Sequence, residues 1–443
     1  MIVFLLFLIA ASLGACRPVP SPPAPAPPVP SPAIPAATPS SARETACVVL
    51  APGPVQQADT LTVAMSGMVD PSHAPVPVSD AERLVFAQLY EPLVRVDCAG
   101  RVVPGLAESW SVDSGGRRWT FTLRRDAQFW DGAPVSANDV IASWRGRDSL
   151  LTDQAIVLGP RDVRVGLRDS SSVTRLTGTL PAATKPSPDR GWPIGTGPYW
   201  MSGSTVTGVL VAQPVARGGR AIAFHDVSGS DPRDVLDRGI DLLLTDDPSV
   251  LSYAGSREQY AVLPLVWDRT YVLAMQGGPA PVVDRQDLMT AVHAEARAAE
   301  GRPCPAADAV EGSGGGSGGG EATAARPILP LRRLVFDRTD RTARELAERL
   351  VARGVLGAGV PAVGVAPADF VAALRSNNAW AYIAAVPPPL PPPSGAVCPG
   401  GVGVAGGEPR VRALVDVRRY AIVRRGIPPL LLDADGTLRL VPR

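Results

Sequence analysis

Lysine, histidine and aromatic residues are scarce in this chain of 443 residues. Lys185 is the only lysine, there are three histidines, and the aromatic residues make up 5% of the chain. The 43 basic and 42 acidic side chains give a net charge of +1, so the chain lacks the basic excess that is typical of a nucleic-acid surface. The shortage of aromatic rings also argues against a surface that stacks many bases.

The apolar stretch at the N-terminus, Ile2 to Leu13, is too short to span a membrane, because a spanning helix needs about 20 such residues. Its length is typical of the hydrophobic region of a secretory signal. The stretch ends in Leu13-Gly-Ala-Cys16, which resembles a bacterial lipobox. That resemblance implies a signal peptide over residues 1–15 and a Cys16 that carries diacylglycerol and an acyl chain such as palmitate, which would anchor the exported chain to a membrane. An ordinary signal peptide followed by an incidental cysteine is the alternative.

Proline is abundant, with 48 residues, well above its usual share of about 5%. Residues 16–58 are therefore predicted to be a lipidated cysteine followed by a Pro/Ala-rich tether in an extended conformation. Residues 312–320 are predicted to be a flexible Gly/Ser linker, and residues 387–407 form a Pro/Gly-rich segment.

The remaining cysteines favour structural disulfides over a metal site. In an oxidising compartment four cysteines suggest two disulfides, with three possible connectivities. Proximity in the sequence favours Cys47–Cys98 and Cys304–Cys398. No CxxC spacing is present and the histidines are scattered, so neither a metal site nor a cofactor is expected; the histidines are His73, His225 and His293.

Apolar periodicity predicts a chain in which strands and helices alternate. Helices are predicted to begin at the capping patterns Ser79-x-x-Glu82, Ser136-x-x-Asp139 and Thr342-x-x-Glu345. Strands are predicted over residues 61–65, 119–123, 240–244, 261–266, 271–275 and 331–336, with a hairpin over 430–440. Intermingled strands and helices indicate an α/β or α+β class.

Several motifs, taken in order, carry a resemblance to a known family. They are Leu89-Tyr-Glu-Pro-Leu-Val94, Val103-Pro-Gly-Leu-Ala-Glu-Ser-Trp110, Trp119-Thr-Phe-Thr-Leu-Arg124, Phe129-Trp-Asp-Gly-Ala-Pro-Val-Ser-Ala-Asn-Asp-Val140, Gly195-Thr-Gly-Pro-Tyr199 and Gly239-Ile-Asp-Leu242. Together they resemble the family 5 extracellular solute-binding proteins, the receptors of peptide and nickel ABC importers.

The resemblance implies an α/β, two-lobed, periplasmic-binding-protein-like fold (class II, type C) with an extra subdomain in lobe one. Lobe one would comprise residues 59–80, 190–275 and 417–443, the subdomain residues 81–189, and lobe two residues 276–416. The implied function is that of a membrane-anchored, monomeric receptor, in the periplasm or on the outer face of the cytoplasmic membrane. It would bind a small molecule or peptide, deliver it to an ABC permease, and catalyse no reaction.

Candidate ligand-binding residues follow from family position and side-chain type. Met65 and Ser66 follow the first strand and Tyr90 ends the first helix, while Tyr271 and Trp380 are expected near the hinges. Trp192 and Thr196 flank the GTGPY turn. Aromatic side chains with a polar tip suit a site that is wet when open and dry when closed. The alternative for each of these residues is a place in the core.

The second lobe departs from the family pattern. The Pro/Gly-rich segment stands where peptide receptors carry an acidic segment, and no equivalent carboxylate for a peptide ammonium is evident. A desolvated ammonium without a paired carboxylate costs several kcal/mol, so an unusual small solute is expected. A degenerate binding fold that acts as a surface sensor or assembly subunit, without transport, is the alternative function.

Overall fold

The computed structural model describes residues 47–56, 58–145, 147, 155–167, 176, 181–188, 191–201, 208–267, 269–275, 285–304, 331–376, 379–386 and 410–440. The predicted signal peptide, Cys16, the Gly/Ser linker, the Pro/Gly-rich segment and Cys398 lie outside these ranges, as do residues 17–46 of the predicted tether. Among the described helices, none has the length and hydropathy needed to cross a membrane.

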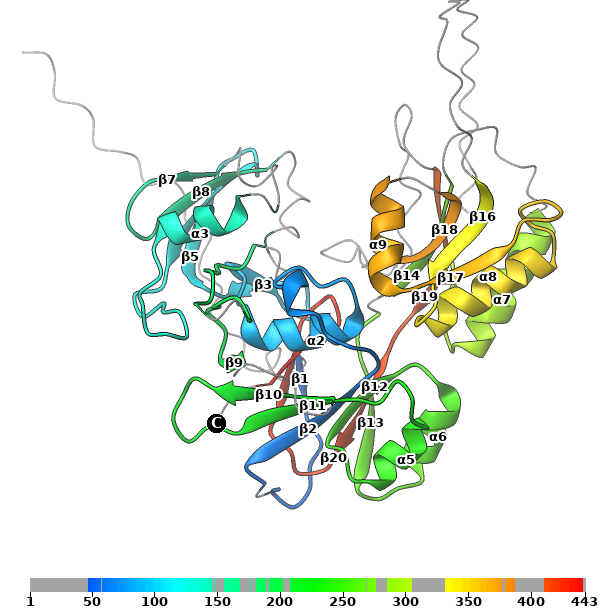
Figure 1. The fold of residues 1–443 in the computed structure, drawn as a ribbon, viewed down its shortest axis with the longest axis horizontal. Helices are drawn as coiled ribbons and strands as arrows, with labels where there is room; N and C mark the ends of the chain where they lie inside the picture. The colour runs from blue at the N-terminus through cyan, green and yellow to red at the C-terminus, as the bar shows by residue number, and fades with distance from the viewer. Residues whose placement is uncertain are drawn as a thin grey trace, which may run out of the picture. The chain divides into compact units, whose positions relative to one another are not determined.

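A seven-stranded mixed sheet forms the first lobe (Figure 1). Its central strand β2 pairs in parallel with β11 and β12, and the other neighbours are antiparallel. In spatial order the strands are β13 (Tyr260–Pro264), β20 (Tyr420–Arg424), β12 (Leu242–Thr245), β2 (Thr60–Met65), β11 (Ala221–Asp226), β10 (Val209–Pro214) and β9 (Tyr199–Met201).

Helices cover both faces of this sheet because its apolar side chains alternate between two cores. In β12, Leu242 packs with the core that contains α2 (Asp80–Leu89). The next residue, Leu243, packs with α5 (Pro232–Asp237) and α6 (Pro248–Gly255) on the other face. This two-residue period is the expected pattern for a strand buried on both sides.

Helix α2 begins where the capping pattern predicts. The Ser79 side chain accepts a hydrogen bond from the Glu82 backbone N–H at 3.2 Å. The Glu82 carboxylate does not complete the capping box with Ser79; it accepts from the Val78 N–H at 2.7 Å and lies 2.7 Å from His73 Nδ1. The carboxylate therefore ties the preceding loop to the start of the helix.

A four-stranded antiparallel sheet forms the subdomain, in the order β5 (Ala107–Val112), β6 (Arg118–Leu123), β8 (Asp162–Gly166) and β7 (Ala155–Val157). As predicted, Trp119, Phe121 and Leu123 of β6 are buried. Helix α3 (Ala137–Trp144) packs in the same core and carries the predicted capping box at Ser136.

Two small sheets complete this half of the chain. Strands β3 (Val94–Val96) and β4 (Val102–Pro104) form a hairpin. Strand β1 (Val48–Val49) joins the C-terminal hairpin of β21 (Leu430–Leu432) and β22 (Leu438–Leu440). A disulfide joins Cys47 to Cys98, as predicted.

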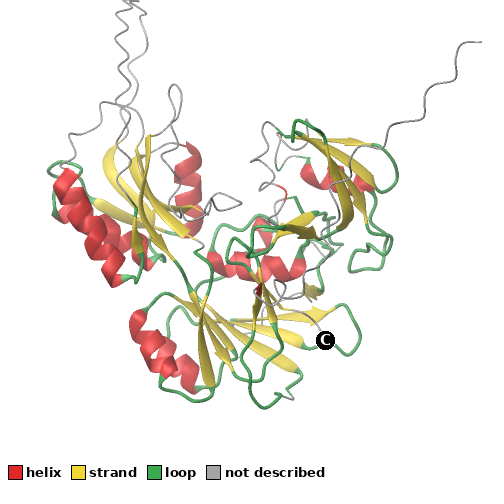
Figure 2. Ribbon diagram, turned by 180° about the vertical axis from the view of Figure 1, so that it is seen from behind, coloured by secondary structure: helices red, strands yellow, loops and turns green. Residues whose placement is uncertain are grey.

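A six-stranded mixed sheet forms the second lobe. Its order is β15 (Arg302–Pro303), β19 (Arg410–Val417), β14 (Arg269–Met275), β18 (Ala379–Val386), β16 (Leu331–Asp337) and β17 (Ala362–Val365). Helices α7 (Arg285–Ala298) and α8 (Arg341–Ala352) pack on one face, and α9 (Pro367–Ser376) packs on the other. Figure 2 shows these helices flanking the sheet.

Three predictions need correction. Strand β14 belongs to the second sheet, so the predicted end of lobe one at residue 275 is one strand too late. Helix α2 packs in the first lobe's core, so the subdomain begins after residue 81. The predicted tether does not extend to residue 58, because β1 already pairs with β21.

The predicted start of α8 at Thr342 is also wrong. Asp340 is the N-cap, and its side chain accepts a hydrogen bond from the Ala343 backbone N–H at 2.9 Å. An N-cap aspartate satisfies a free N–H of the first turn. The predicted end of the helix is confirmed, because Gly354 follows the C-cap with a φ of +65°.

Candidate functional site

A buried tyrosine marks the C-terminal end of α2. Tyr90 is fully buried, and its hydroxyl donates a hydrogen bond to the Pro193 carbonyl at 3.1 Å. Its ring lies 5.8 Å from the ring of Phe86 and 5.8 Å from that of Trp130. Burial raises the pKa of the Tyr90 phenol well above its ordinary value, and the positive charge of Arg147 acts in the opposite direction.

The GTGPY turn packs against the end of α2 at two glycines. A Cβ on Gly195 would lie 2.5 Å from the Leu89 carbonyl oxygen and 2.6 Å from the Tyr90 ring. A Cβ on Gly197 would lie 2.5 Å from the carbonyl oxygen of Gln88. Distances this short leave no space for a Cβ atom at either position. The two glycines therefore allow the turn to pass directly over the end of the helix.

Two polar atoms beside this turn are buried without a hydrogen-bond partner in the described structure: the hydroxyl oxygen of Thr196 and the indole N–H of Trp130. Thr196 is 5% exposed. The Trp130 backbone N–H donates to the Gly195 carbonyl at 3.1 Å, so both residues belong to one neighbourhood. An unpaired buried polar group is costly, and a ligand that supplied the missing bonds would relieve that cost.

A cationic side chain reaches the same neighbourhood from the C-terminal end of α3. Arg147 is half-buried, and its guanidinium donates to the Ala182 carbonyl at 3.2 Å and to the Thr184 hydroxyl. Thr184 precedes Lys185, which forms an antiparallel bridge with Ile194 through hydrogen bonds of 3.0 and 2.9 Å. Within the described part of the chain Arg147 has no ion pair with a carboxylate.

The end of β2 contributes one buried and one exposed residue. Met65 is buried in the first core, whereas Ser66 is exposed in the loop that follows. The next residue, Gly67, donates its backbone N–H to Asp226 Oδ1 at 3.1 Å and has a φ of +117°. This left-handed conformation favours glycine and turns the chain away from the strand.

A charged group joins the first lobe to the second where the chain passes between them. Arg269, the first residue of β14, pairs with Asp80 at the start of α2 and lies 3.9 Å from Asp340. Arg419, in the second connecting segment, lies 3.8 Å from Asp80. Desolvation opposes ionisation of Asp80, but the neighbouring arginines outweigh it and hold the pKa of the carboxyl below its ordinary value.

Helix N-termini of the two lobes also meet in this group. Arg341, in the first turn of α8, lies 3.6 Å from Asp247, the N-cap of α6. The Thr342 hydroxyl donates to Asp246 at 3.3 Å. Each of these polar contacts between the lobes joins one side chain to another.

Part of this chain is similar in sequence to known binding proteins. Residues 101–147 match the family described as bacterial extracellular solute-binding proteins, family 5 Middle. The periplasmic oligopeptide-binding protein OppA of Haemophilus influenzae is 45% identical over 64 residues, which are 14% of this chain and 12% of OppA. The nickel-binding periplasmic protein of Escherichia coli is 44% identical over 63 residues, again 14% and 12% of the two chains.

The fold extends the similarity beyond these short alignments. The crystal structure of NikA from Brucella suis in complex with Fe(III)-EDTA matches with a TM-score of 0.59 at 20% identity, covering 87% of this chain and 100% of NikA. The resemblance to the family 5 solute-binding proteins is confirmed. The two-lobed α/β fold is confirmed as well, although the sequence alignments span only about an eighth of the curated relatives.

The family match ends at the site described above. Residues 101–147 include β4, the subdomain strands β5 and β6, and α3, and they end at Arg147. The matched block contains Trp130 and the turn at Asp131 and Gly132. Most of it is scaffold, since Trp119, Phe121 and Val140 are buried in the subdomain core.

The structure brings three of the predicted ligand-binding residues together. Tyr90, Trp192 and Thr196 lie around the turn; the Trp192 ring packs 6.1 Å from Phe86. Tyr271 lies near the inter-lobe group, where its hydroxyl is 2.9 Å from Asp340. A role of these side chains in ligand binding stays a prediction.

Trp380 is not near the hinge, and that expectation is wrong. In the antiparallel pairing of β14 with β18, Thr270 next to the hinge pairs with Val386, whereas Met275 at the far end pairs with Ala381. Trp380 precedes Ala381 and is 8% exposed in the second core, where Arg332 lies 5.8 Å from its ring. Its place in the sheet indicates a packing role.

The candidate residues predicted from the sequence do not include Arg147, Trp130, Arg269 or Asp340. A lone arginine after a helix carries no local signal, because its partners at 182 and 184 are distant in sequence. Trp130 lies within the motif Phe129 to Val140, which carries the family resemblance but predicts no binding role for its indole. Its unpartnered indole N–H can be seen only in three dimensions.

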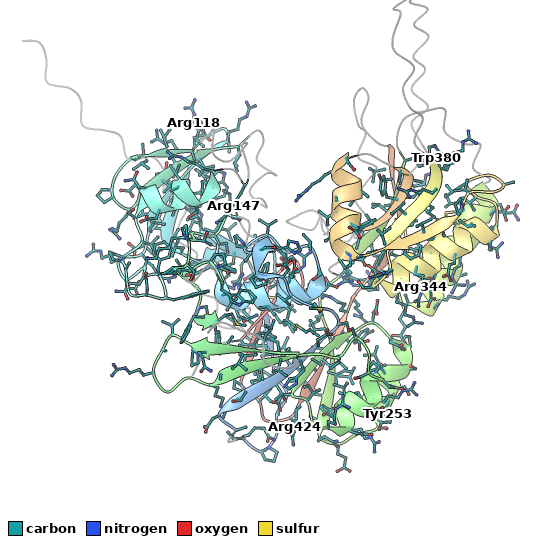
Figure 3. The ribbon with its side chains drawn as sticks, viewed as in Figure 1. Arg118, Arg147, Tyr253, Arg344, Trp380 and Arg424 are labelled. Carbon is teal, nitrogen blue, oxygen red and sulfur yellow. A yellow bond between two sulfur atoms is a disulfide. The ribbon has the colours of Figure 1, made fainter. Side chains whose placement is uncertain are left out.

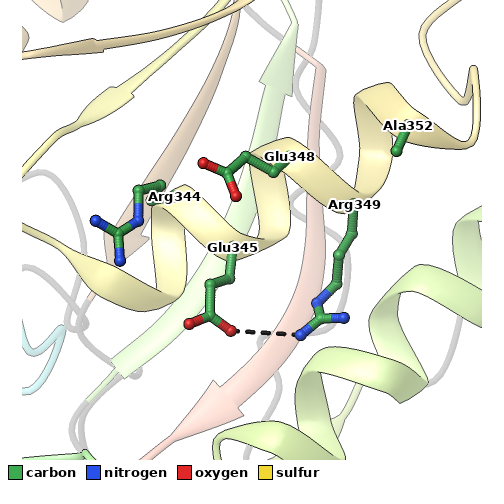
Figure 4. Close-up of a pocket in the computed structure, with 5 residues that line it drawn as sticks. All are labelled: Arg344, Glu345, Glu348, Arg349 and Ala352. Atoms are coloured by element: carbon green, nitrogen blue, oxygen red, sulfur yellow. Dashed lines mark hydrogen bonds and ion pairs between the residues drawn. The ribbon is translucent and has the colours of Figure 1, made fainter.

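A pocket along α8 is lined by Arg344, Glu345, Glu348, Arg349 and Ala352 (Figure 4). Two of its charged residues pair with each other, since Arg349 lies 3.3 Å from Glu345; Arg349 also lies 2.8 Å from Glu295, a buried residue of α7. These contacts hold α8 against α7, so we assign no ligand to this pocket. Within the described residues no cluster of three or more His, Cys, Asp or Glu side chains could hold a metal ion.

Proposed function

We propose that this protein is the membrane-anchored substrate-binding component of an ABC importer, which binds a small solute between its two lobes and delivers it to a permease. The resemblance to family 5 solute-binding proteins supports the receptor role. The single observation that carries it for this chain is the group at the turn, where the Thr196 hydroxyl and the Trp130 indole N–H are buried and unpaired.

The connection between the lobes supports a mechanism in which the solute selects a closed state. Two segments link the sheets, from β13 to β14 and from β19 to β20, and the polar contacts beside them are ion pairs and hydrogen bonds. A solute that touches both lobes favours the closed state by its differential affinity for that state. The closed receptor then docks on the permease.

The proposed role is binding and not catalysis. The oligopeptide-binding and nickel-binding proteins similar to this chain bear names that describe binding. Lipid anchoring through Cys16, export to the envelope and a monomeric state are further parts of the proposal, and the Cys16 signal supports the first two.

A ligand screen tests this function. The purified chain is heated with members of a panel of peptides, sugars, organic acids and metal chelates, and hits are titrated by calorimetry. A solute at 100 times its Kd should raise the free energy of unfolding by about 2.7 kcal/mol. A flat response to every class would contradict the receptor role and favour the sensor or assembly subunit.

A further inference from the structure

The guanidinium of Arg147 is a charged group whose only described partners are neutral. Its two hydrogen bonds go to the Ala182 carbonyl and the Thr184 hydroxyl, and no described carboxylate forms an ion pair with it. Burial lowers the pKa of Arg147, which shows that the surroundings disfavour its charge. Half-buried arginines are normally matched by a carboxylate or phosphate, because the planar fork binds two oxygens at once.

Two nearby side chains without a hydrogen-bond partner in the described structure can also act as donors. The Trp130 indole can only donate, and the Thr196 hydroxyl is free to donate. Tyr90 lies between these donors and Arg147. Its ring packs 5.8 Å from the Trp130 ring, and a Cβ on Gly195, next to Thr196, would touch the Tyr90 ring. The positive charge of Arg147 acts on the Tyr90 phenol. One cation and two unused donors complement an anion.

The charged residues described nearby pair with each other and not with Arg147. Lys185, a second described cation of the neighbourhood, pairs with Asp131 at 2.5 Å and lies 4.7 Å from the Phe129 ring centre. Asp131 is therefore occupied by the lysine. Of these two described cations, Arg147 is the one without a described carboxylate partner, so a ligand can neutralise its charge.

We propose that the solute carries a carboxylate and that Arg147 binds it, with the Thr196 hydroxyl and the Trp130 indole N–H as neutral donors beside it. The inference rests on the proposed receptor function and names its substrate class. Figure 3 labels Arg147 and also Arg118, an exposed arginine on β6 of the same subdomain that serves as the matched control.

The test uses the full chain in detergent and matched probe pairs: N-acetylated amino acids and dipeptides with a free carboxylate, each beside its carboxamide. Calorimetry gives Kd for both members. In the wild type the carboxylate should bind about 10 to 100 times more tightly than its amide, as expected for a charge-assisted hydrogen bond. R147Q should abolish this ratio, R147K should restore part of it, and R118Q should leave it unchanged.

The outcomes separate this inference from the proposed function. Equal affinity for carboxylates and amides in the wild type overturns the anion site but leaves the receptor role. A preference that persists in R147Q overturns the assignment to Arg147. If no pair binds while another class from the wider panel does, the carboxylate class is wrong; if nothing binds, both proposals are wrong. Should R147Q fail to fold, T196V decides instead, and an unchanged ratio in T196V contradicts the proposal.

Discussion

The hydroxyl of Tyr271 lies 2.9 Å from each carboxylate oxygen of Asp340. Tyr271 is fully buried in β14, and Asp340 caps α8, so this contact joins a strand next to the hinge to a helix N-terminus. Burial raises the pKa of Asp340 to about 6, although Arg269 and the hydrogen bonds of the carboxylate favour its ionised form. The hinge region thus contains a carboxyl group that titrates just below neutral pH.

We expect the D340N variant to have a flatter pH dependence of stability than the wild type. The folded pKa of about 6 exceeds the ordinary value of 3.8, so between these values the folded state holds more protons than the unfolded state. The stability from this group is complete below pH 4 and is lost as the pH rises through 6. The loss is roughly 1 to 3 kcal/mol, since one pKa unit corresponds to about 1.4 kcal/mol.

Urea denaturation between pH 4 and pH 7 measures this difference. The control is D231N, which alters the exposed N-cap of α5 and should leave the slope of the wild type intact. Identical slopes for D340N and the wild type would show that the pKa of Asp340 is not raised.

The T196V variant separates stability from binding. Because the Thr196 hydroxyl is buried without a partner, its replacement by a methyl group should increase the free energy of unfolding by about 1 kcal/mol. The same change should weaken binding of any solute that the hydroxyl contacts. Thermal unfolding and calorimetry measure the two effects. The control T196S keeps the hydroxyl but loses a buried methyl group, so it should be less stable than the wild type. If T196V loses as much stability as T196S, the hydroxyl has a structural partner and the prediction is wrong.

Local patterns in the sequence predicted the elements better than the boundaries between lobes. The alternation of Trp119, Phe121 and Leu123 was enough to place β6, and Ser136 with Asp139 was enough to place α3. Strand β14 was assigned to the wrong lobe because a buried strand has the same pattern in either sheet. Only its pairing with β18 and β19 decides between them.

Only those site residues that lie in local sequence motifs could be predicted. Tyr90 and Thr196 belong to motifs that can be recognised in one dimension. Arg147 forms its hydrogen bond with Thr184, which is 37 residues away in the sequence, and Arg269 forms its hydrogen bond with Asp80, which is 189 residues away. Contacts of this kind are created by the fold and leave no local pattern.

We expect G197A to destabilise the junction between the turn and α2. A Cβ at this position would approach backbone atoms of Gln88 and Leu89 to about 2.5 Å, and backbone atoms cannot move aside as a flexible side chain can. Overpacking of this kind should cost about 2 to 3 kcal/mol in the free energy of unfolding. Chemical denaturation tests this, with G229A as the control because no atom lies within 4 Å of the Cβ it would add. Equal stability of the two variants would contradict the close packing.

The disulfide between Cys47 and Cys98 should contribute strongly to stability. It closes a loop with a sequence separation of 51 residues, and in the chain-entropy model a loop of this length corresponds to about 4 kcal/mol. We expect the double variant C47S/C98S to lose about this amount in urea denaturation. A loss below about 1 kcal/mol would contradict the entropic argument. Cys304 is also disulfide-bonded, and its predicted pairing with Cys398 can be checked by mass mapping of the same non-reduced samples.

Membrane attachment tests the Cys16 proposal. The acyl chains attached at Cys16 would each contribute about 0.8 kcal/mol per buried CH₂ group, and two or more chains hold a protein firmly on a bilayer. No described helix could replace them as a membrane-spanning anchor. We therefore expect C16S to move from the membrane fraction to the soluble fraction after a high-salt wash, with the wild type and S31A remaining on the membrane. Immunoblots of the two fractions measure the shift, and mass spectrometry of the wild type should find the added lipid on Cys16. Retention of C16S on washed membranes would mean that another part of the chain holds the protein there, and the lipoprotein assignment would then be wrong.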